Sequence, residues 1–177
     1  MRIRETEFEE IISELKIQNR IRQLADEINR DYAGRSPLFL PVLNGSFLFA
    51  ADLIRNINLD CRVSFVKHTS YQGTASGGQL KTLIGLQESV FNQDLIIVED
   101  IVDTGLTMQQ IMEELNGLGA RSIEMAVLLK KKKLSQETSD PKYLGFTIGS
   151  EFVVGYGLDF DGYGRNLKDL YHQKSAS

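Results

Sequence analysis

The segment that most constrains the fold of this chain is residues 98–107, which read Val-Glu-Asp-Ile-Val-Asp-Thr-Gly-Leu-Thr. An apolar run, Leu95–Val98, leads directly into its two adjacent acids. Such a run is typical of a parallel strand buried on both faces, and charged side chains are tolerated only at the open carboxyl end of that strand. Open α/β sheets bind their ligands at this edge. The segment therefore predicts a parallel sheet with a binding site at its carboxyl edge.

A turn rich in hydroxyl groups follows the acids and leads into a helix. The helix is indicated by apolar residues three or four positions apart, namely Met108, Ile111, Met112 and Leu115. Residues 104–107 would place backbone N–H groups and hydroxyls at its N-terminus, where phosphate groups bind readily. Carboxylates beside such a turn can accept hydrogen bonds from both hydroxyls of a sugar diol. A purely structural role, in which Asp103 or Thr104 caps the helix, would leave two acids unexplained.

The same order of strand, polar turn and helix occurs earlier in the chain. Residues 37–43 predict a strand, residues 44–46 a turn and residues 47–54 a helix. Pro41 has no N–H group and must lie where no ladder hydrogen bond is needed. Two such units predict an α/β fold with a mainly parallel, doubly wound sheet.

The remaining elements fit one domain that covers residues 1–177. Ser13 is expected to cap an N-terminal helix whose apolar stripe begins at Ile17. The C-terminal third shows no long helix and is expected to pack over one end of the sheet. Further strands are predicted at residues 62–67, 80–86, 122–129, 143–148 and 152–156.

Charge and composition exclude several classes of function. A net charge of −4 and a pI near 5.3 argue against a nucleic-acid binder. No apolar stretch approaches the length of a membrane span, and no signal peptide follows Met1. We therefore expect a cytoplasmic protein with small-molecule substrates, which can be anionic if Mg²⁺ mediates their binding.

Two polar segments allow more than one interpretation. Residues 70–78 are glycines and small polar residues with Tyr71 as their one large side chain, which predicts a mobile loop that closes as a lid. A hairpin tip without a role is the alternative. The lysines at positions 130–133 are expected to form a solvated loop as a group.

These segments together resemble the type I phosphoribosyltransferases, and among them the hypoxanthine-guanine phosphoribosyltransferase family. The resemblance rests on four segments in the family's order, which are Val42–Phe47, Ser70-Tyr71, Val98–Thr107 and Phe152–Asp159 with Arg165. It implies a central parallel sheet flanked by helices, with a small hood formed by the chain ends. It also implies Mg²⁺-dependent transfer of a 5-phosphoribosyl group from phosphoribosyl pyrophosphate to N9 of a 6-oxopurine by a homodimer or homotetramer. The products would be IMP or GMP, and pyrophosphate.

The resemblance assigns the phosphoribosyl side of the site to residues 99–107. Glu99 and Asp100 would bind the ribose hydroxyls directly or through Mg²⁺, and Asp103 would act as general base near N7 of the purine. The lid residues Ser70 and Tyr71 would cover the pyrophosphate during catalysis. The residues implied around ribose and 5′-phosphate are Glu99, Asp100, Ile101, Val102, Asp103, Thr104, Gly105, Leu106 and Thr107.

The pyrophosphate side is assigned to a loop and two cations. Leu43, Asn44 and Gly45 match the family's pyrophosphate loop, which has a cis peptide bond between its first two residues. The middle position is often Lys or Arg in the family, so we expect backbone N–H groups to replace a side-chain role for Asn44. Arg165 and Lys67 are implied as further pyrophosphate ligands.

On the purine side, the resemblance implies that Lys131 donates to the purine O6, with Lys130 as the alternative because the lysines are consecutive. Phe152 would stack on the purine ring, and Val153 would contact its edge through the backbone. Asp159 would help to coordinate a second Mg²⁺, so that the metal ligands are Glu99, Asp100 and Asp159.

Other functions share part of this pattern. A xanthine- or guanine-preferring phosphoribosyltransferase would carry the same motifs. A regulator with this fold that binds nucleic acid is opposed by the acidic net charge. A Mg²⁺-dependent phosphohydrolase would leave the lid and residues 152–159 unexplained.

Overall fold

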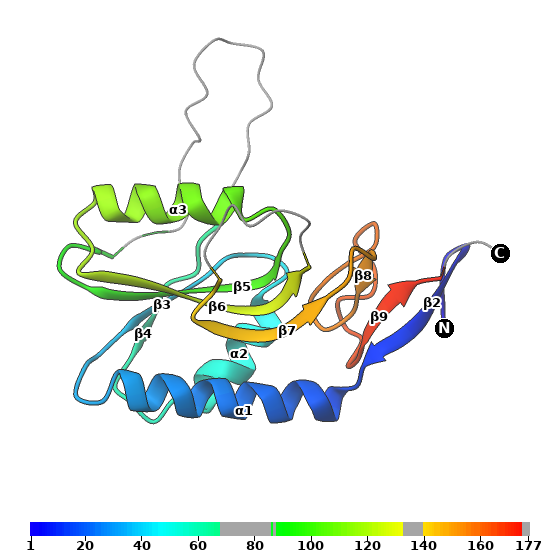
Figure 1. The fold of residues 1–177 in the computed structure, drawn as a ribbon, viewed down its shortest axis with the longest axis horizontal. Coiled ribbons are helices and arrows are strands. Elements are labelled where there is room, and N and C mark those ends of the chain that lie inside the picture. Colours follow the sequence, from blue (N-terminus) through cyan, green and yellow to red (C-terminus); the bar gives the residue numbers. More distant parts are fainter. Residues whose placement is uncertain (68–85, 87, 133–139, 175–177) are drawn as a thin grey trace, which may run out of the picture.

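A central parallel sheet forms the body of the protein in the computed structural model, which describes residues 1–67, 86, 88–132 and 140–174. Its five strands lie in the order β4-β3-β5-β6-β7, and every neighbouring pair is parallel (Figure 1). The predicted parallel α/β sheet is confirmed. The strands are β3 (Leu38–Pro41), β4 (Arg62–Val63), β5 (Asp94–Val102), β6 (Ser122–Lys131) and β7 (Tyr143–Ile148).

Helices cover both faces of this sheet. Helices α1 (Glu14–Asp31) and α2 (Phe47–Arg55) lie on one face, and α3 (Leu106–Gly117) lies on the other (Figure 1). Alternate residues of β5 serve the two sides: Ile96 belongs to the core under α1 and α2, and Ile97 to the core under α3. Both faces are buried, which explains why the apolar run of β5 is continuous. No helix of the described ranges has the length and hydropathy of a membrane span.

A second, antiparallel sheet forms the hood. Its strand order is β1-β2-β9-β8, so strands from both ends of the chain pair with one another. Strand β2 lies beside β9 (Figure 1), with Phe8 opposite Gln173, and Val153 lies opposite His172. The predicted hood from the chain ends is present. Its strands are β1 (Arg2–Ile3), β2 (Thr6–Ile12), β8 (Val153–Val154) and β9 (Leu170–Gln173).

Strand lengths differ from the sequence prediction at several places. Strand β5 continues through the acids to Val102, because its pairing with β6 extends as far as Lys130. Strand β4 is shorter than predicted, and beyond it Val66 makes one isolated bridge to Val42. Strand β8 has two residues instead of the predicted five. Most of the predicted strand at 80–86 lies outside the described residues.

The expected cap of the first helix is also different. The Ser13 side chain makes no capping hydrogen bond. Instead, Asp169 of the hood accepts a hydrogen bond of 2.7 Å from the Glu14 backbone N–H. Capping from a distant segment satisfies one of the free N–H groups of the first helical turn, and it fixes the hood to the start of α1.

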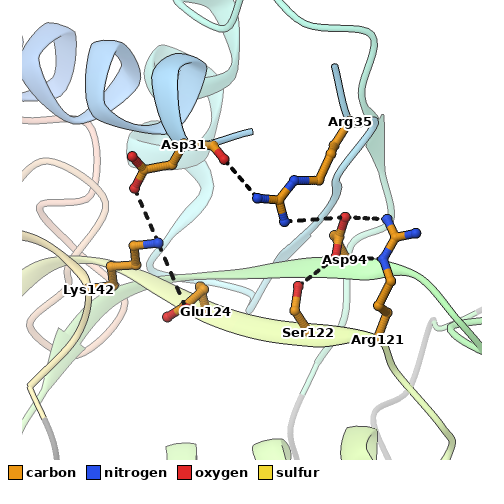
Figure 2. A network of polar contacts seen from close by, with 7 residues as sticks. All are labelled: Asp31, Arg35, Asp94, Arg121, Ser122, Glu124 and Lys142. Atoms are coloured by element: carbon orange, nitrogen blue, oxygen red, sulfur yellow. Dashed lines mark hydrogen bonds and ion pairs between the residues drawn. The ribbon is translucent and has the colours of Figure 1, made fainter. Parts of the chain in front are cut away.

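A polar network lies at the amino edge of the sheet, at the end of β5 away from Glu99 and Asp100. Asp94 begins β5, is 1% exposed and accepts hydrogen bonds from Arg121 Nε at 2.9 Å and Ser122 Oγ at 2.7 Å (Figure 2). The nearest Arg35 nitrogen is 3.9 Å from its carboxylate. The hydrogen bonds from Arg121 hold the pKa of Asp94 below its ordinary value. This edge is therefore stabilised by the ionised form of Asp94.

We predict that Asp94→Asn lowers the free energy of unfolding at pH 7 by about 2 kcal/mol, because a charge-assisted pair with Arg121 is lost. The folded-state pKa of Asp94 is depressed, so its stabilisation is present above its unfolded-state pKa of about 3.9 and is lost as the pH falls through the folded-state value. Urea unfolding of both proteins between pH 7 and pH 3 should show a narrowing difference. A constant difference would contradict an ionic contribution.

Candidate active site

The carboxyl ends of β3, β5 and β6 meet at one edge of the sheet, beside the hood. The turn of residues 42–46 follows β3, the acids lie at the end of β5, and Lys131 ends β6. Cavities at this edge are lined by residues from β5, β6 and the hood segment 152–159. Parallel strands and short turns thus bring together segments that are far apart in the chain.

The two adjacent acids at the end of β5 point to different surroundings. Glu99 Oε2 is buried and has no hydrogen-bond partner among the described residues. Burial, and then the neighbouring Asp100 carboxylate, raise the pKa of Glu99 well above its usual value. Asp100 Oδ1 accepts from the Ile101 N–H at 2.9 Å, while its other oxygen lies against Gly45 so closely that a Cβ on Gly45 would overlap it. Asp100 therefore links β5 to the turn after β3.

These acids fit a magnesium ion that is shared with a substrate. Mg²⁺ is usually held by one or two carboxylates together with substrate oxygens and water. The buried Oε2 of Glu99 is a carboxylate oxygen for which a cation would supply the missing partner. The described part of the chain contains no cluster of three or more acids, histidines or cysteines arranged for a metal. The predicted ligand Asp159 lines a cavity together with Asp100, and its carboxylate contacts Arg165 at 2.5 Å.

The predicted phosphate turn lies at the N-terminus of α3. Gly105 is the N-cap residue with a φ of 78°, a conformation that glycine adopts without steric cost. Glycine has no side chain that could cap the helix. The contact from Leu106 N to Thr104 Oγ1 is long, at 3.5 Å. Asp103 and Thr107 are exposed. This turn borders a cavity of about 210 Å³ that also reaches Glu99.

Hydrogen bonds to the carbonyls of Val42 and Val66 hold the predicted pyrophosphate loop in place. The Leu43–Asn44 peptide bond is cis, as the family resemblance implies. Buried Ser46 donates from Oγ to the Val42 carbonyl at 2.6 Å, and Leu43 N–H donates to the Val66 carbonyl at 2.8 Å. Lys67, the next residue after Val66, is exposed. The loop and Lys67 are therefore neighbours in the fold.

The predicted purine residues line one cavity of about 280 Å³ together with Asp100 of β5. Its lining includes Asp100, Asp103, Lys131, Phe152, Val153 and Asp159. Phe152 is 44% exposed and contacts the Phe160 ring edge-to-face at 5.7 Å between centroids, which leaves part of its ring open to a ligand. Val153 is buried.

Alternation along β6 separates the two candidate lysines. Lys131 Nζ is 3.5 Å from Asp103 Oδ2, and Lys131 lines the predicted purine cavity of about 280 Å³. Lys130 instead forms an ion pair with Asp140 and borders a different cavity beside α3. Successive side chains of a strand point to opposite faces, so only one of the two can reach the acids. Neither lysine lies in the fully solvated loop expected for the run, because both belong to β6.

The remaining predicted residues are placed less completely. Arg165 donates from Nη1 to the Gly157 carbonyl at 2.7 Å in addition to its ion pair with Asp159, so protein groups occupy its guanidinium. Ser70 and Tyr71 lie outside the described residues. Sequence reasoning gave no role to Tyr156, whose hydroxyl contacts Asp52 of α2. No local signal relates these two positions, because more than a hundred residues separate them.

This arrangement defines the class of protein, a type I phosphoribosyltransferase fold with its site at the carboxyl edge of the sheet. The sequence matches the family described as phosphoribosyl transferase domain over residues 8–161. A hypoxanthine-guanine phosphoribosyltransferase of Lactococcus lactis is 38% identical over 158 residues, which cover 89% of this chain and 86% of that protein. The chain belongs to the hypoxanthine-guanine phosphoribosyltransferase family.

Two further relatives extend the comparison. The crystal structure of a hypoxanthine-guanine phosphoribosyltransferase from Bacillus anthracis superposes with a TM-score of 0.86 at 34% identity, covering 95% of this chain and 99% of that one. The bifunctional protein TilS/HprT of Listeria innocua is 37% identical over 158 residues, or 89% of this chain. The chain spans only 24% of the length of that bifunctional relative.

Proposed function

We propose that this chain transfers a 5-phosphoribosyl group from phosphoribosyl pyrophosphate to N9 of hypoxanthine and guanine, which gives IMP or GMP in purine salvage. The observation that carries the proposal is the cavity in which Asp103, Lys131 and Phe152 lie together beside the phosphate turn. An acceptor, a cation and a partly exposed ring suit N7, O6 and the face of a 6-oxopurine, respectively. The names of the relatives agree with this choice of substrates.

The phosphoribosyl group would be held by residues 99–107. The N–H groups at the start of α3, together with the hydroxyls of the exposed residues Thr104 and Thr107, suit a 5′-phosphate. Glu99 and Asp100 would hold the ribose hydroxyls and Mg²⁺, which supplies positive charge for the pyrophosphate as it leaves. Asp103 would accept the proton that the purine loses when its nitrogen attacks the anomeric carbon.

The leaving pyrophosphate would lie over the loop of Leu43, Asn44 and Gly45. Backbone N–H groups of this loop, Lys67 and Arg165 would neutralise its charge in the transition state. Arg165 must then give up part of its contact with Asp159, which would free that carboxylate for a second Mg²⁺. The lid role of Ser70 and Tyr71 would exclude water from the reactive anomeric carbon.

A spectrophotometric assay tests this proposal directly. The purified protein is mixed with phosphoribosyl pyrophosphate, Mg²⁺ and, in turn, hypoxanthine, guanine, xanthine and adenine. Transfer to hypoxanthine and guanine is the expected result, and EDTA should abolish it. A preference for xanthine would favour the neighbouring specificity class. RNA binding that weakens with salt, without transfer to any base, would instead favour a nucleic-acid-binding regulator.

The position of the two lysines gives a paired prediction. Lys131→Met should lower kcat/KM for hypoxanthine by about 10- to 100-fold, because a hydrogen bond from a charged group to the purine is lost. Lys130→Met removes the same charge from the opposite face of β6 and should leave kcat/KM nearly unchanged. Steady-state kinetics of the two variants checks the assignment. A larger loss in Lys130→Met would reverse it.

The assembly and location of the protein are part of the same proposal. A homodimer or homotetramer and a cytoplasmic location follow from the family resemblance, and no partner beyond the two substrates is needed for the chemistry. Analytical ultracentrifugation of the purified protein measures the first of these.

A further inference from the structure

Tyr156 occupies an unusual backbone position in the hood segment. Its φ is 44°, in the left-handed region, and the glycines on either side have φ values of 105° and 101°. A bulky residue in this region is a conformational outlier that the surrounding structure must hold in place. The side chain is only 4% exposed. Its contacts should therefore explain why the chain keeps a tyrosine in this position.

The Tyr156 hydroxyl is fixed by side chains from two helices. It donates to Asp52 Oδ2 of α2 at 2.5 Å. Gln18 Nε2 of α1 donates to the same oxygen at 2.5 Å and lies 3.4 Å from the tyrosine oxygen. Burial, and then the hydrogen bond to Asp52, raise the pKa of Tyr156, so the phenol keeps its proton at neutral pH. The hood is thus tied to α1 and α2 by one buried polar cluster.

The residue after Tyr156 belongs to the purine segment and contacts residues of the proposed pyrophosphate side. A Cβ on Gly157 would overlap the carbonyl oxygen of Gly45 in the pyrophosphate loop. The Gly157 N–H donates to the Arg165 carbonyl at 3.0 Å, and its own carbonyl accepts from Arg165 Nη1 at 2.7 Å. Asp52 lies on α2, the helix that begins two residues after Gly45. A tyrosine held on α2 therefore places Gly157 against the loop that precedes that helix.

We propose that Tyr156 is a positioning residue, which through Asp52 sets the separation between the purine segment 152–159 and the pyrophosphate loop 43–45. This inference rests on the proposed transferase function. In that reaction the purine must approach the anomeric carbon from the side opposite the leaving pyrophosphate. The two groups are bound by separate segments of the chain, and a misplacement of about 1 Å can reduce turnover by about a hundredfold.

The test compares two buried tyrosines with the same chemistry. Tyr156→Phe keeps the ring and removes the hydrogen bond to Asp52. Tyr143→Phe is the matched control, because the buried Tyr143 hydroxyl donates to Asp31 Oδ2 at 3.0 Å on the α1 end that lies away from the site. Each variant loses one tyrosine–carboxylate hydrogen bond, so similar decreases in Tm are expected. Turnover should differ between them.

For Tyr156→Phe, kcat should fall by about 10- to 100-fold. Its Kd for phosphoribosyl pyrophosphate with Mg²⁺, measured by calorimetry, should stay within about twofold, since the hydroxyl group that is removed bonds to Asp52 and Gln18. Tyr143→Phe should keep the wild-type kcat. The Asp52→Ala variant removes the same bond from the α2 side, and the double variant Tyr156→Phe/Asp52→Ala should be no slower than either single variant.

The outcomes separate this inference from the function on which it rests. Wild-type protein that transfers phosphoribose, together with equal kcat values for Tyr156→Phe and Tyr143→Phe, would leave the function intact and overturn the positioning role. Independent, multiplicative losses in the double variant would also overturn it. Wild-type protein that transfers to none of the bases would overturn both. If Tyr156→Phe does not fold, Asp52→Ala is compared with Tyr143→Phe on the same measurements.

Discussion

Asp103→Asn is expected to lower turnover by about 10²- to 10⁴-fold, the range for loss of a general base. An asparagine amide has the shape of the carboxylate but does not take up the proton that the purine releases. The fold should tolerate the change, because the Asp103 side chain is 65% exposed. The Kd for phosphoribosyl pyrophosphate should change little, since the N–H groups of the phosphate turn remain.

Kinetics and binding measured on the same Asp103→Asn preparation distinguish a base from a ligand. The ion pair between Asp103 and Lys131 is also lost in this variant, so Lys131→Met serves as its control. That control removes the same ion pair while the carboxylate stays in place. A collapse of phosphoribosyl pyrophosphate affinity with normal turnover of the bound complex would show that Asp103 only binds substrate.

Gly45→Ala should lower both turnover and phosphoribosyl pyrophosphate affinity by about 10- to 100-fold, because an added methyl group would overlap the Asp100 carboxylate. The backbone of Gly45 is outside the left-handed region, so alanine itself is not strained there. The loss of turnover and of affinity should therefore arise from displacement of Asp100 and of the pyrophosphate loop. Calorimetric binding and steady-state kinetics measure the two effects.

A second glycine supplies the control for Gly45→Ala. Gly117 at the end of α3 has open space around its Cα, and Gly117→Ala should be neutral or slightly stabilising. Coupling to Asp100 is tested in the Asp100→Ala variant, which no longer has the carboxylate that the methyl group would overlap. Adding Gly45→Ala to this variant should lower its activity little further. Full activity in Gly45→Ala would show that the observed contact with Asp100 has no part in the reaction.

Local patterns of sequence predicted most of the central sheet. The apolar run of β5 and the helical spacing of α3 are both contained in a short window, and both elements were confirmed. The end of β5 was misjudged, because Glu99 and Asp100 look like a strand terminus while backbone pairing with β6 continues past them. Composition predicts where apolar side chains stop, and the ladder of hydrogen bonds need not stop there.

Contacts between distant segments were outside the reach of local patterns. Asp169 as the cap of α1, Asp52 as the partner of Tyr156, and the Gly45–Asp100 contact each join segments that only the complete fold brings together. Family resemblance placed the purine residues, but four consecutive lysines left their register open. The alternation of side chains in β6 shows which lysine faces Asp103. The roles assigned to these residues stay predictions until the variants are measured.

The hood sheet pairs strands from the two ends of the chain, with Phe8 of β2 opposite Gln173 of β9. A newly made chain therefore cannot complete this sheet until β9 has been synthesised. At about 5–20 residues per second, a ribosome needs roughly 10–30 s after making β2 to finish β9. During this interval one edge of β2 has no partner and is open to other strands. The central sheet can form before β9 exists. We therefore expect the hood, and with it the purine side, to be the last part of the molecule to mature on the ribosome.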